Sequence, residues 1–311
     1  MTRQLQLPKP SPAQHIVGLI KGCITSLIVA LNTLIVFSAM IPFALLKAAL
    51  RTAGVRRFCD RILNALAATW VRINGGWISA AQPIRWDVEG VDTLNPRGWY
   101  LVSSNHQSWV DILVLQKIFL GRIPFLKFFL KRELIYVPVI GLAWWALDFP
   151  FMQRKGGMSR GKTDLATTRK ACERFRLIPT SVMNFLEGTR FTREKHRTQR
   201  STFKHLLKPR VGGIATALGT MGDIFDALLD VTIVYPQGVP TFWDILSGRV
   251  REIIVRVRSL EIPRDLLDGD YERDAAYRAR IQAWIVDMWT HKDQQIDELL
   301  AQFSASAKPR V

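Results

Sequence analysis

A histidine and an aspartate five residues apart have the types and spacing that acid–base chemistry requires. His106 lies in a polar turn after the apolar segment 99–103, and Ser108 is suited to cap a helix that begins directly after it. Asp111 would then lie in the first turn of that helix and face the imidazole. Its carboxylate could hold one ring nitrogen protonated while the other accepts a proton from a substrate. The same spacing fits a structural role, in which Asp111 only helps Ser108 to cap the helix.

A second polar turn, Glu187 to Arg190, follows the apolar segment 181–185. Gly188 would let the backbone turn tightly or approach a ligand closely. Arg190 offers a forked donor that matches a phosphate, and Thr189 offers a hydroxyl. A third candidate, Arg154, ends the aromatic-rich segment 148–154 and would add a second cationic contact to an anionic ligand. A solvated turn and a solvated strand end are the alternatives for the two arginines.

Residues 190–210 carry eight Lys or Arg and one acidic residue, Glu194. This segment is the best candidate for a nucleic-acid interface, but it lacks the interleaved aromatic residues of a base-stacking platform. A solvated loop or a contact with an anionic membrane explains it equally well. His196 and His205 lack metal-ligand spacing and a carboxylate cluster, so we expect surface residues there and no metal site.

The composition limits the class of protein. Hydrophobic residues make up 48% of the 311 residues, which excludes a disordered tail protein and a small disulfide-stapled domain. The formal net charge of +17 favours polyanions, whether nucleic acid, anionic lipid or phosphorylated substrates. Three widely spaced cysteines, Cys23, Cys59 and Cys172, indicate a reducing compartment without structural disulfides.

The N-terminal region predicts contact with a membrane. Residues 22–46 carry no charge, and as a helix they would extend ~37 Å against a hydrocarbon core of ~30 Å. Asn32 and Pro42 within this segment suggest a broken or re-entrant helix, and basic residues on both flanks leave its orientation open. Apolar residues then recur every three or four positions over residues 55–77, which predicts a second helix. Gly75-Gly76 is expected to mark the end of this helix. This second helix either packs on the globular domain or lies in the membrane interface.

From about Pro83 onward, short apolar runs alternate with helical stretches, which indicates an α/β domain with a largely parallel sheet flanked by helices. We expect residues 1–82 to form a membrane-associated two-helix module and residues 83–311 an α/β domain with a long C-terminal helix. The expected strands are 85–88, 99–103, 181–185, 231–235 and 253–258. The expected helices are 109–119, 162–175, 212–218 and about 270–303.

Four segments together resemble the sequence blocks of the glycerolipid acyltransferase family, particularly its PlsC-like bacterial 1-acylglycerol-3-phosphate acyltransferases. The resemblance covers roughly residues 85–245, and the wider sequence is similar to the YihG-like branch of that family. The fourth block departs from the family, which often shows a Val-Pro-Val strand where Tyr235-Pro236 closes the strand here. The blocks are NHQSWVD at 105–111, residues 149–154, EGTR at 187–190, and residues 231–236.

This resemblance implies an enzyme in which His106 is the general base on a glycerol hydroxyl and Asp111 orients it. The hydroxyl would attack an acyl thioester directly, without a covalent acyl-enzyme. Arg190, with Arg154 as a second contact, would bind the acceptor phosphate. The residues that would shape the phosphate pocket are Glu187, Gly188 and Thr189.

The implied reaction acylates the sn-2 hydroxyl of lysophosphatidic acid and gives phosphatidic acid. No cofactor is expected besides the co-substrate, an acyl-CoA or acyl carrier protein thioester. The expected location is the bacterial inner membrane with the catalytic domain on its cytoplasmic face, in contact with anionic lipid and not with nucleic acid. Two alternatives stay open: acylation of another lysophospholipid, or a non-catalytic basic protein that binds membranes or nucleic acid.

Overall fold

The computed structural model describes residue 7 and the ranges 10–50, 52–128, 130–137, 140–149, 151–152, 179–267 and 273–306, together with residues 269 and 271. Arg154, Cys172 and the helix expected at 162–175 lie outside the described residues.

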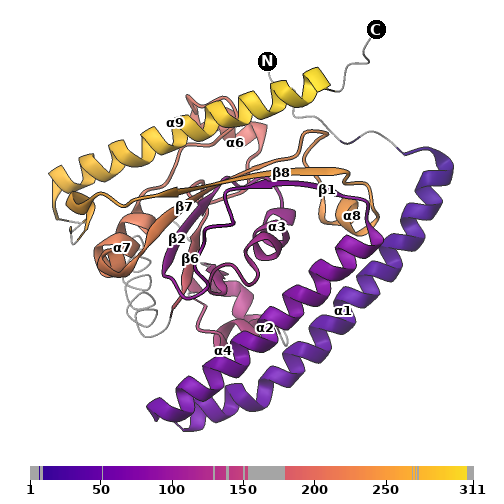
Figure 1. The fold of residues 1–311 in the computed structure, drawn as a ribbon, viewed down its shortest axis with the longest axis horizontal. Coiled ribbons are helices and arrows are strands. Elements are labelled where there is room, and N and C mark those ends of the chain that lie inside the picture. The colour runs from indigo at the N-terminus through magenta and orange to yellow at the C-terminus, as the bar shows by residue number, and fades with distance from the viewer. Residues whose placement is uncertain are drawn as a thin grey trace.

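A six-stranded, mostly parallel sheet forms the centre of the molecule (Figure 1). Its order is β1-β8-β7-β2-β6-β3, and β7 and β8 form the antiparallel pair among these neighbours. The strands are β1 (Arg85–Glu89), β2 (Tyr100–Ser104), β3 (Leu126–Phe128), β6 (Ser181–Asn184), β7 (Ala227–Val234) and β8 (Glu252–Leu260). A separate short pair joins β4 (Leu130–Lys131) to β5 (Phe151–Met152). The predicted α/β fold with a largely parallel sheet is confirmed.

Helices cover both faces of this sheet (Figure 1). Val102 on β2 packs into the core beneath α3 (Val110–Phe119) and the N-terminal helices, while its neighbour Leu101 packs under α7 (Gly212–Met221) and α9 (Ala275–Ser306). This alternation is expected of a strand buried on both faces. The remaining elements are α3 (Val110–Phe119), η1 (Arg132–Tyr136), α4 (Ile140–Ala146), α6 (Arg193–Gln199), α7 (Gly212–Met221), η2 (Gly222–Ile224), α8 (Phe242–Leu246), η3 (Arg264–Leu266) and α9 (Ala275–Ser306).

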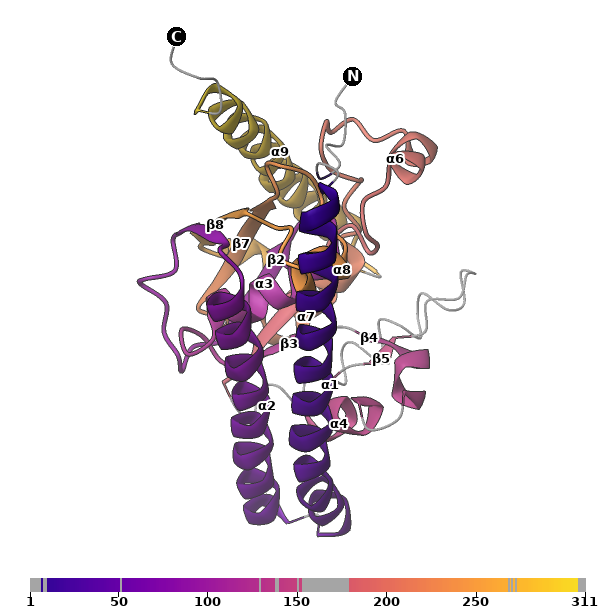
Figure 2. The ribbon, with the colours of Figure 1, turned by 90° about the vertical axis from the view of Figure 1, so that its right-hand side faces the viewer.

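Two long helices, α1 (Pro12–Ala49) and α2 (Ala53–Ala81), form an antiparallel hairpin along one side of the domain (Figure 2). The expected break at Pro42 is wrong, because α1 runs through it. Met40 and Ala44, two residues before and two after Pro42, are buried, and burial of this helix face offsets the backbone hydrogen bond that proline cannot donate. The expected end of the second helix at Gly75-Gly76 is also wrong, since α2 continues for a further turn.

Polar side chains join the two helices of the hairpin. The amide of Asn32 donates to the carbonyl of Trp70 at 3.1 Å and to Asn74 Oδ1 at 2.8 Å. The indole of Trp77 donates to Thr25 Oγ1 at 3.1 Å. Asn32 therefore pairs two helices and does not interrupt one. Within the described part of the chain, α1 is the one helix long and apolar enough to cross a membrane.

Candidate active site

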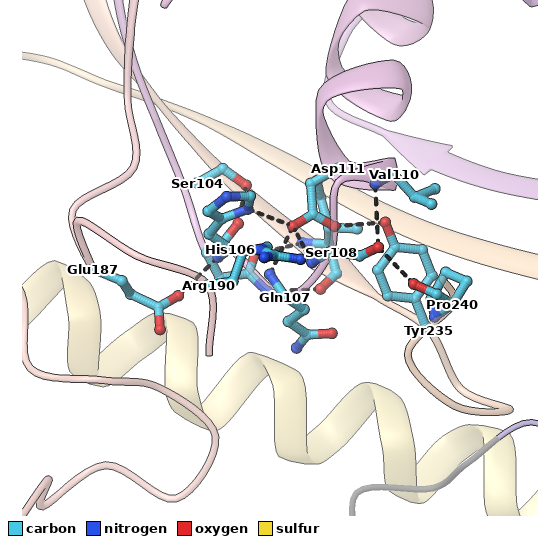
Figure 3. Close-up of polar contacts among 12 residues, drawn as sticks. Ser104, His106, Gln107, Ser108, Val110, Asp111, Glu187, Arg190, Tyr235 and Pro240 are labelled. Carbon is cyan, nitrogen blue, oxygen red and sulfur yellow. Dashed lines mark hydrogen bonds and ion pairs between the residues drawn. The ribbon is translucent and has the colours of Figure 1, made fainter. Parts of the chain in front are cut away.

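The His106 turn lies where β2 ends and α3 begins, at the same edge of the sheet as the end of β6 (Figure 3). His106 Nδ1 is 2.8 Å from Asp111 Oδ2, and Asp111 lies in the first turn of α3 with its side chain 1% exposed. The helix begins at Val110, and Ser108 is not its N-cap residue. The Ser108 hydroxyl instead donates to the carbonyl of Pro240 at 2.5 Å and accepts from the Val110 N–H at 3.2 Å.

Asp111 accepts hydrogen bonds at both carboxylate oxygens. The backbone N–H groups of Gln107 and Ser108 donate to Oδ2 at 2.6 and 2.8 Å. The hydroxyl of Tyr235, which follows β7, donates to Oδ1 at 2.6 Å. Figure 3 shows His106 and Tyr235 on opposite sides of this carboxylate. Asp111 thus holds both the backbone of the turn and the imidazole, while the expected cap by Ser108 is wrong because Trp109 is the N-cap residue of α3.

Tyr235 is a residue of the site that the sequence reasoning missed. Burial, reinforced by the nearby Asp111 carboxylate, raises the pKa of Tyr235 well above its ordinary value. The phenol therefore keeps its proton and remains a donor at neutral pH. The one available signal was the position of Tyr235 at the end of the strand in the fourth block, where the family often has an apolar residue.

The imidazole of His106 is packed as well as hydrogen-bonded. It stacks on Phe185 with ring centroids 3.9 Å apart and an interplanar angle of 15°. Because an ionised carboxylate can only accept, Nδ1 carries the proton toward Asp111 and the lone pair lies on Nε2. The side chain stays 12% exposed. This arrangement presents a basic nitrogen to a substrate in a fixed orientation.

Asn105 anchors the same turn to β7. Its side-chain Nδ2 donates to the carbonyl of Ile233 at 2.8 Å, and its Oδ1 accepts from the Ile233 N–H at 2.8 Å. Asn105 and Ile233 are both buried. The Asn105 side chain therefore satisfies the backbone N–H and C=O of Ile233, as a neighbouring strand would. The sequence reasoning gave Asn105 no role of its own.

Glu187 holds the His106 turn from the opposite side. Its Oε1 accepts from the His106 N–H at 2.7 Å, and its Oε2 accepts from the Leu207 N–H at 3.1 Å. The side chain is fully buried, and this burial raises the pKa of Glu187 to about 8. The structure therefore places Glu187 beneath the turn, as a residue that positions His106 through its backbone.

The rest of the second turn reaches toward the first. Gly188 has a positive φ of 66°, which a residue with a side chain rarely adopts, and Thr189 Oγ1 accepts from Lys195 Nζ at 2.7 Å. The guanidinium of Arg190 lies 5.0 Å from the centroid of the exposed Trp109 ring. Within the described residues, no carboxylate pairs with Arg190, so the guanidinium can bind an anion.

Two further histidines have structural roles. His196 Nε2 lies 2.7 Å from the carbonyl of Phe203, and His205 Nε2 lies 3.1 Å from Asp297. Among the described residues, no group of three or more His, Cys, Asp or Glu is placed to hold a metal ion.

Comparison with known proteins identifies relatives of this domain. Residues 85–224 match the family model described as Acyltransferase. The chain is 28% identical over 206 residues to 1-acyl-sn-glycerol-3-phosphate acyltransferase delta of Mus musculus, covering 62% of this chain and 51% of that protein. It is 26% identical over 289 residues to 1-acyl-sn-glycerol-3-phosphate acyltransferase 3 of Arabidopsis thaliana, covering 88% and 71% of the two chains. The chain thus spans about half the length of the mouse relative.

A solved structure supports the same assignment at the level of the fold. The crystal structure of PlsC, the 1-acyl-sn-glycerophosphate acyltransferase from Thermotoga maritima, matches with a TM-score of 0.55 and 15% sequence identity. The match covers 91% of this chain and 98% of that chain. Residues 85–224, the segment that matches the Acyltransferase family model, hold both the His106–Asp111 pair and the Glu187–Arg190 turn.

Proposed function

We propose that this protein is a membrane-bound acyltransferase that moves a fatty acyl group from an acyl thioester to the sn-2 hydroxyl of lysophosphatidic acid. The observation that carries this proposal is the buried Asp111 carboxylate 2.8 Å from His106 Nδ1, which leaves Nε2 as the base. The names of the mouse and Arabidopsis relatives describe the same acceptor, 1-acyl-sn-glycerol-3-phosphate.

The reaction requires one proton to move twice. Nε2 of His106 takes the proton of the acceptor hydroxyl while the oxygen attacks the thioester carbonyl and forms a tetrahedral intermediate. The C–S bond then breaks, and the leaving thiolate takes the proton back from the imidazolium. The products are a new ester and a free thiol. Asp111 stabilises the imidazolium between these steps and keeps the ring oriented.

The acceptor's phosphate is assigned to Arg190, with Arg154 as a second contact. The cation–π contact with Trp109 holds the Arg190 guanidinium and leaves its N–H groups for a bidentate phosphate contact. Glu187, Gly188 and Thr189 form the turn that aims Arg190 toward the His106 side of the site.

The membrane supplies the acceptor. Leucine and isoleucine side chains are exposed along α1, which favours immersion of the α1–α2 hairpin in a lipid leaflet. An acyl thioester donor and cysteines without disulfide spacing fit the cytoplasmic face of a bacterial inner membrane.

The test is acyl transfer by the purified full chain in phospholipid vesicles with oleoyl-CoA as donor. The acceptors are lysophosphatidic acid, lysophosphatidylglycerol and glycerol 3-phosphate. We expect the highest kcat/KM for lysophosphatidic acid, and a rise of at least about tenfold in its KM in Arg190→Ala. Faster acylation of lysophosphatidylglycerol, with little effect of Arg190→Ala, would assign the enzyme to another headgroup. Absence of transfer to every acceptor would reject the proposed reaction.

A further inference from the structure

Four exposed cations form a surface that the proposed reaction does not use. We call Arg197, Arg200, Lys208 and Arg210 the cationic ridge. No carboxylate among the described residues pairs with any of the four. Neighbouring Lys204, by contrast, is paired with Asp297 of α9.

The backbone of the cationic ridge is held by hydrogen bonds to α9 and within the segment, so the ridge is not a solvated loop. Asp293 of α9 accepts from the backbone N–H groups of Lys204 and His205, each at 2.7 Å. Lys208 N–H donates to Gln199 Oε1 at 3.2 Å, which holds the two halves of the ridge together. Charges on a fixed backbone lose less conformational entropy when a ligand binds them.

The ridge also adjoins the catalytic turns. The N–H of Phe191 donates to the carbonyl of His106 at 2.7 Å, so the basic segment begins at the site. Arg210 N–H donates to the carbonyl of Leu186 at 2.7 Å. A Cβ placed on Gly188 would lie 2.9 Å from Arg210 Cδ, so this side chain covers the Gly188 turn.

The composition of the ridge argues against two of its possible partners. Large exposed apolar side chains gather on α1 and α8, and none lies between residues 193 and 210, which disfavours a lipid surface. In Figures 1 and 2, α6 lies at the same end of the molecule as α9, opposite the α1–α2 turn. A protein partner would need exposed aromatic or apolar anchors, which the ridge also lacks. Exposed arginines and a lysine on one short segment, without such anchors, fit phosphate groups.

We propose that the cationic ridge binds the nucleotide phosphates of a coenzyme A thioester and so places the acyl donor for attack at His106. Coenzyme A carries a diphosphate and a 3′-phosphate at one end and the thioester at the end of its pantetheine arm. The ridge beside the Gly188 turn holds the phosphates, and the arm reaches the catalytic turn. This inference rests on the proposed function, and it selects acyl-CoA over acyl carrier protein as the donor.

The kinetic test compares two donors that differ in their phosphates, oleoyl-CoA and oleoyl-pantetheine. In Arg200→Gln/Lys208→Gln we expect the KM for oleoyl-CoA to rise about tenfold, as the loss of two exposed charge pairs predicts. The KM for oleoyl-pantetheine and that for lysophosphatidic acid should stay at wild-type values. Arg251→Gln/Arg264→Gln is the matched control, because it removes the same charge at exposed positions outside the basic segment.

A binding measurement tests the cationic ridge as a coenzyme A site independently of the proposed reaction. Titration calorimetry with desulfo-coenzyme A on the full chain in detergent should show binding that weakens about tenfold in the ridge variant and not in the control. If no donor supports transfer but this binding difference is present, the proposed reaction fails and the ridge site stands. Equal effects on both donors, unchanged binding, or a ridge variant impaired only with acyl carrier protein would overturn the inference.

Discussion

At the scale of single residues, the site depends on how the Asp111 carboxylate is held. Gln107 and Ser108 bind it from the turn, and Tyr235 binds it from the strand β7 on the other side. The imidazole of His106 is aligned by this carboxylate, so a donor that fixes Asp111 also fixes the proposed base. We therefore propose that Tyr235 is a positioning residue, which would act on the reaction through Asp111.

Tyr235→Phe removes the phenol and leaves one oxygen of Asp111 without that donor. Because a hydrogen bond to a charged group contributes about 1.5–3 kcal/mol, we expect kcat to fall about ten- to a hundredfold with little change in the KM for lysophosphatidic acid. Tyr277→Phe is the control, since its buried hydroxyl donates to the carbonyl of Leu266 at 3.0 Å, in the core under α9. Equal kcat values in the two variants would show that Tyr235 only stabilises the fold.

The raised pKa of Glu187 predicts that the unfolding free energy of the protein depends on pH. Burial raises its pKa in the folded protein from the ordinary 4.5 to about 8. Between these pH values the unfolded chain has lost the proton that the folded chain keeps, so the unfolding free energy falls as pH rises through this window. The decline should amount to roughly 3–5 kcal/mol. In Glu187→Gln the amide does not titrate, so this decline should be absent.

The measurement is the thermal midpoint of both proteins in detergent from pH 5 to pH 8. The amide of Glu187→Gln places a donor against one backbone N–H, so its midpoint starts lower. The informative quantity is therefore the slope of the thermal midpoint against pH, which should be steeper in the wild type. Parallel curves would show that Glu187 ionises normally in the folded state.

At the scale of secondary-structure elements, α9 supports the site from outside the segment that matches the family model. The indole of Trp289 on α9 donates to the carbonyl of Leu207 at 2.9 Å. The N–H of Leu207 in turn donates to Glu187, which holds the His106 turn. The C-terminal helix thus holds the loop that holds the His106 turn.

Trp289→Phe keeps the packing of the ring and removes this hydrogen bond. We expect the unfolding free energy to fall by about 1–3 kcal/mol, because a buried carbonyl loses its partner. We also expect kcat to fall, since Leu207 and Glu187 lose support. Trp284→Phe on the same helix is the control, as Trp284 is only half-buried. A destabilised Trp289→Phe with wild-type kcat would show that the α9 contact does not reach the site.

The elements differ in how far the sequence could predict them. β2 and β6 were placed to within one or two residues, because an apolar run ends there in a polar turn. β7 begins four residues earlier than expected, because Asp230 interrupts the apolar pattern. That carboxylate is buried in ion pairs with Lys292 and Arg258, both at 2.6 Å. Ion pairs between distant segments leave no signal in the local pattern.

Contacts between distant segments also limit how much of the candidate site the sequence could predict. The turns around His106 and Glu187 were predicted from strand ends, where polar residues of an α/β sheet gather. The contacts of Asn105 and Tyr235 with other segments could not be predicted, because both bonds span more than 120 positions of the chain.

At the scale of the whole molecule, apolar and cationic surfaces lie in different places. Exposed leucines and isoleucines extend along α1, while the cationic ridge lies beside α9. This separation would let the hairpin contact lipid while the ridge remains in water. The acceptor would then reach the site from the membrane and the donor from solution.

Leu27→Glu/Leu31→Glu tests the lipid contact. Both side chains are exposed, at 60% and 47%, so the fold should tolerate the change. We expect partition into anionic vesicles to fall at least about tenfold, because a charged side chain enters the hydrocarbon region unfavourably. Val286→Glu is the control, since Val286 is 38% exposed on α9. Equal vesicle co-sedimentation of both variants would contradict immersion of α1.

The proposed function depends above all on His106 as the base for acyl transfer to lysophosphatidic acid. The most direct measurement is kcat/KM for this transfer in vesicles, for wild type, His106→Ala and the control His291→Ala, whose side chain is 57% exposed on α9. If His106 is the base, we expect wild-type activity in the control and a loss of about 10²- to 10⁴-fold in folded His106→Ala. A His106→Ala protein as active as the control would contradict it.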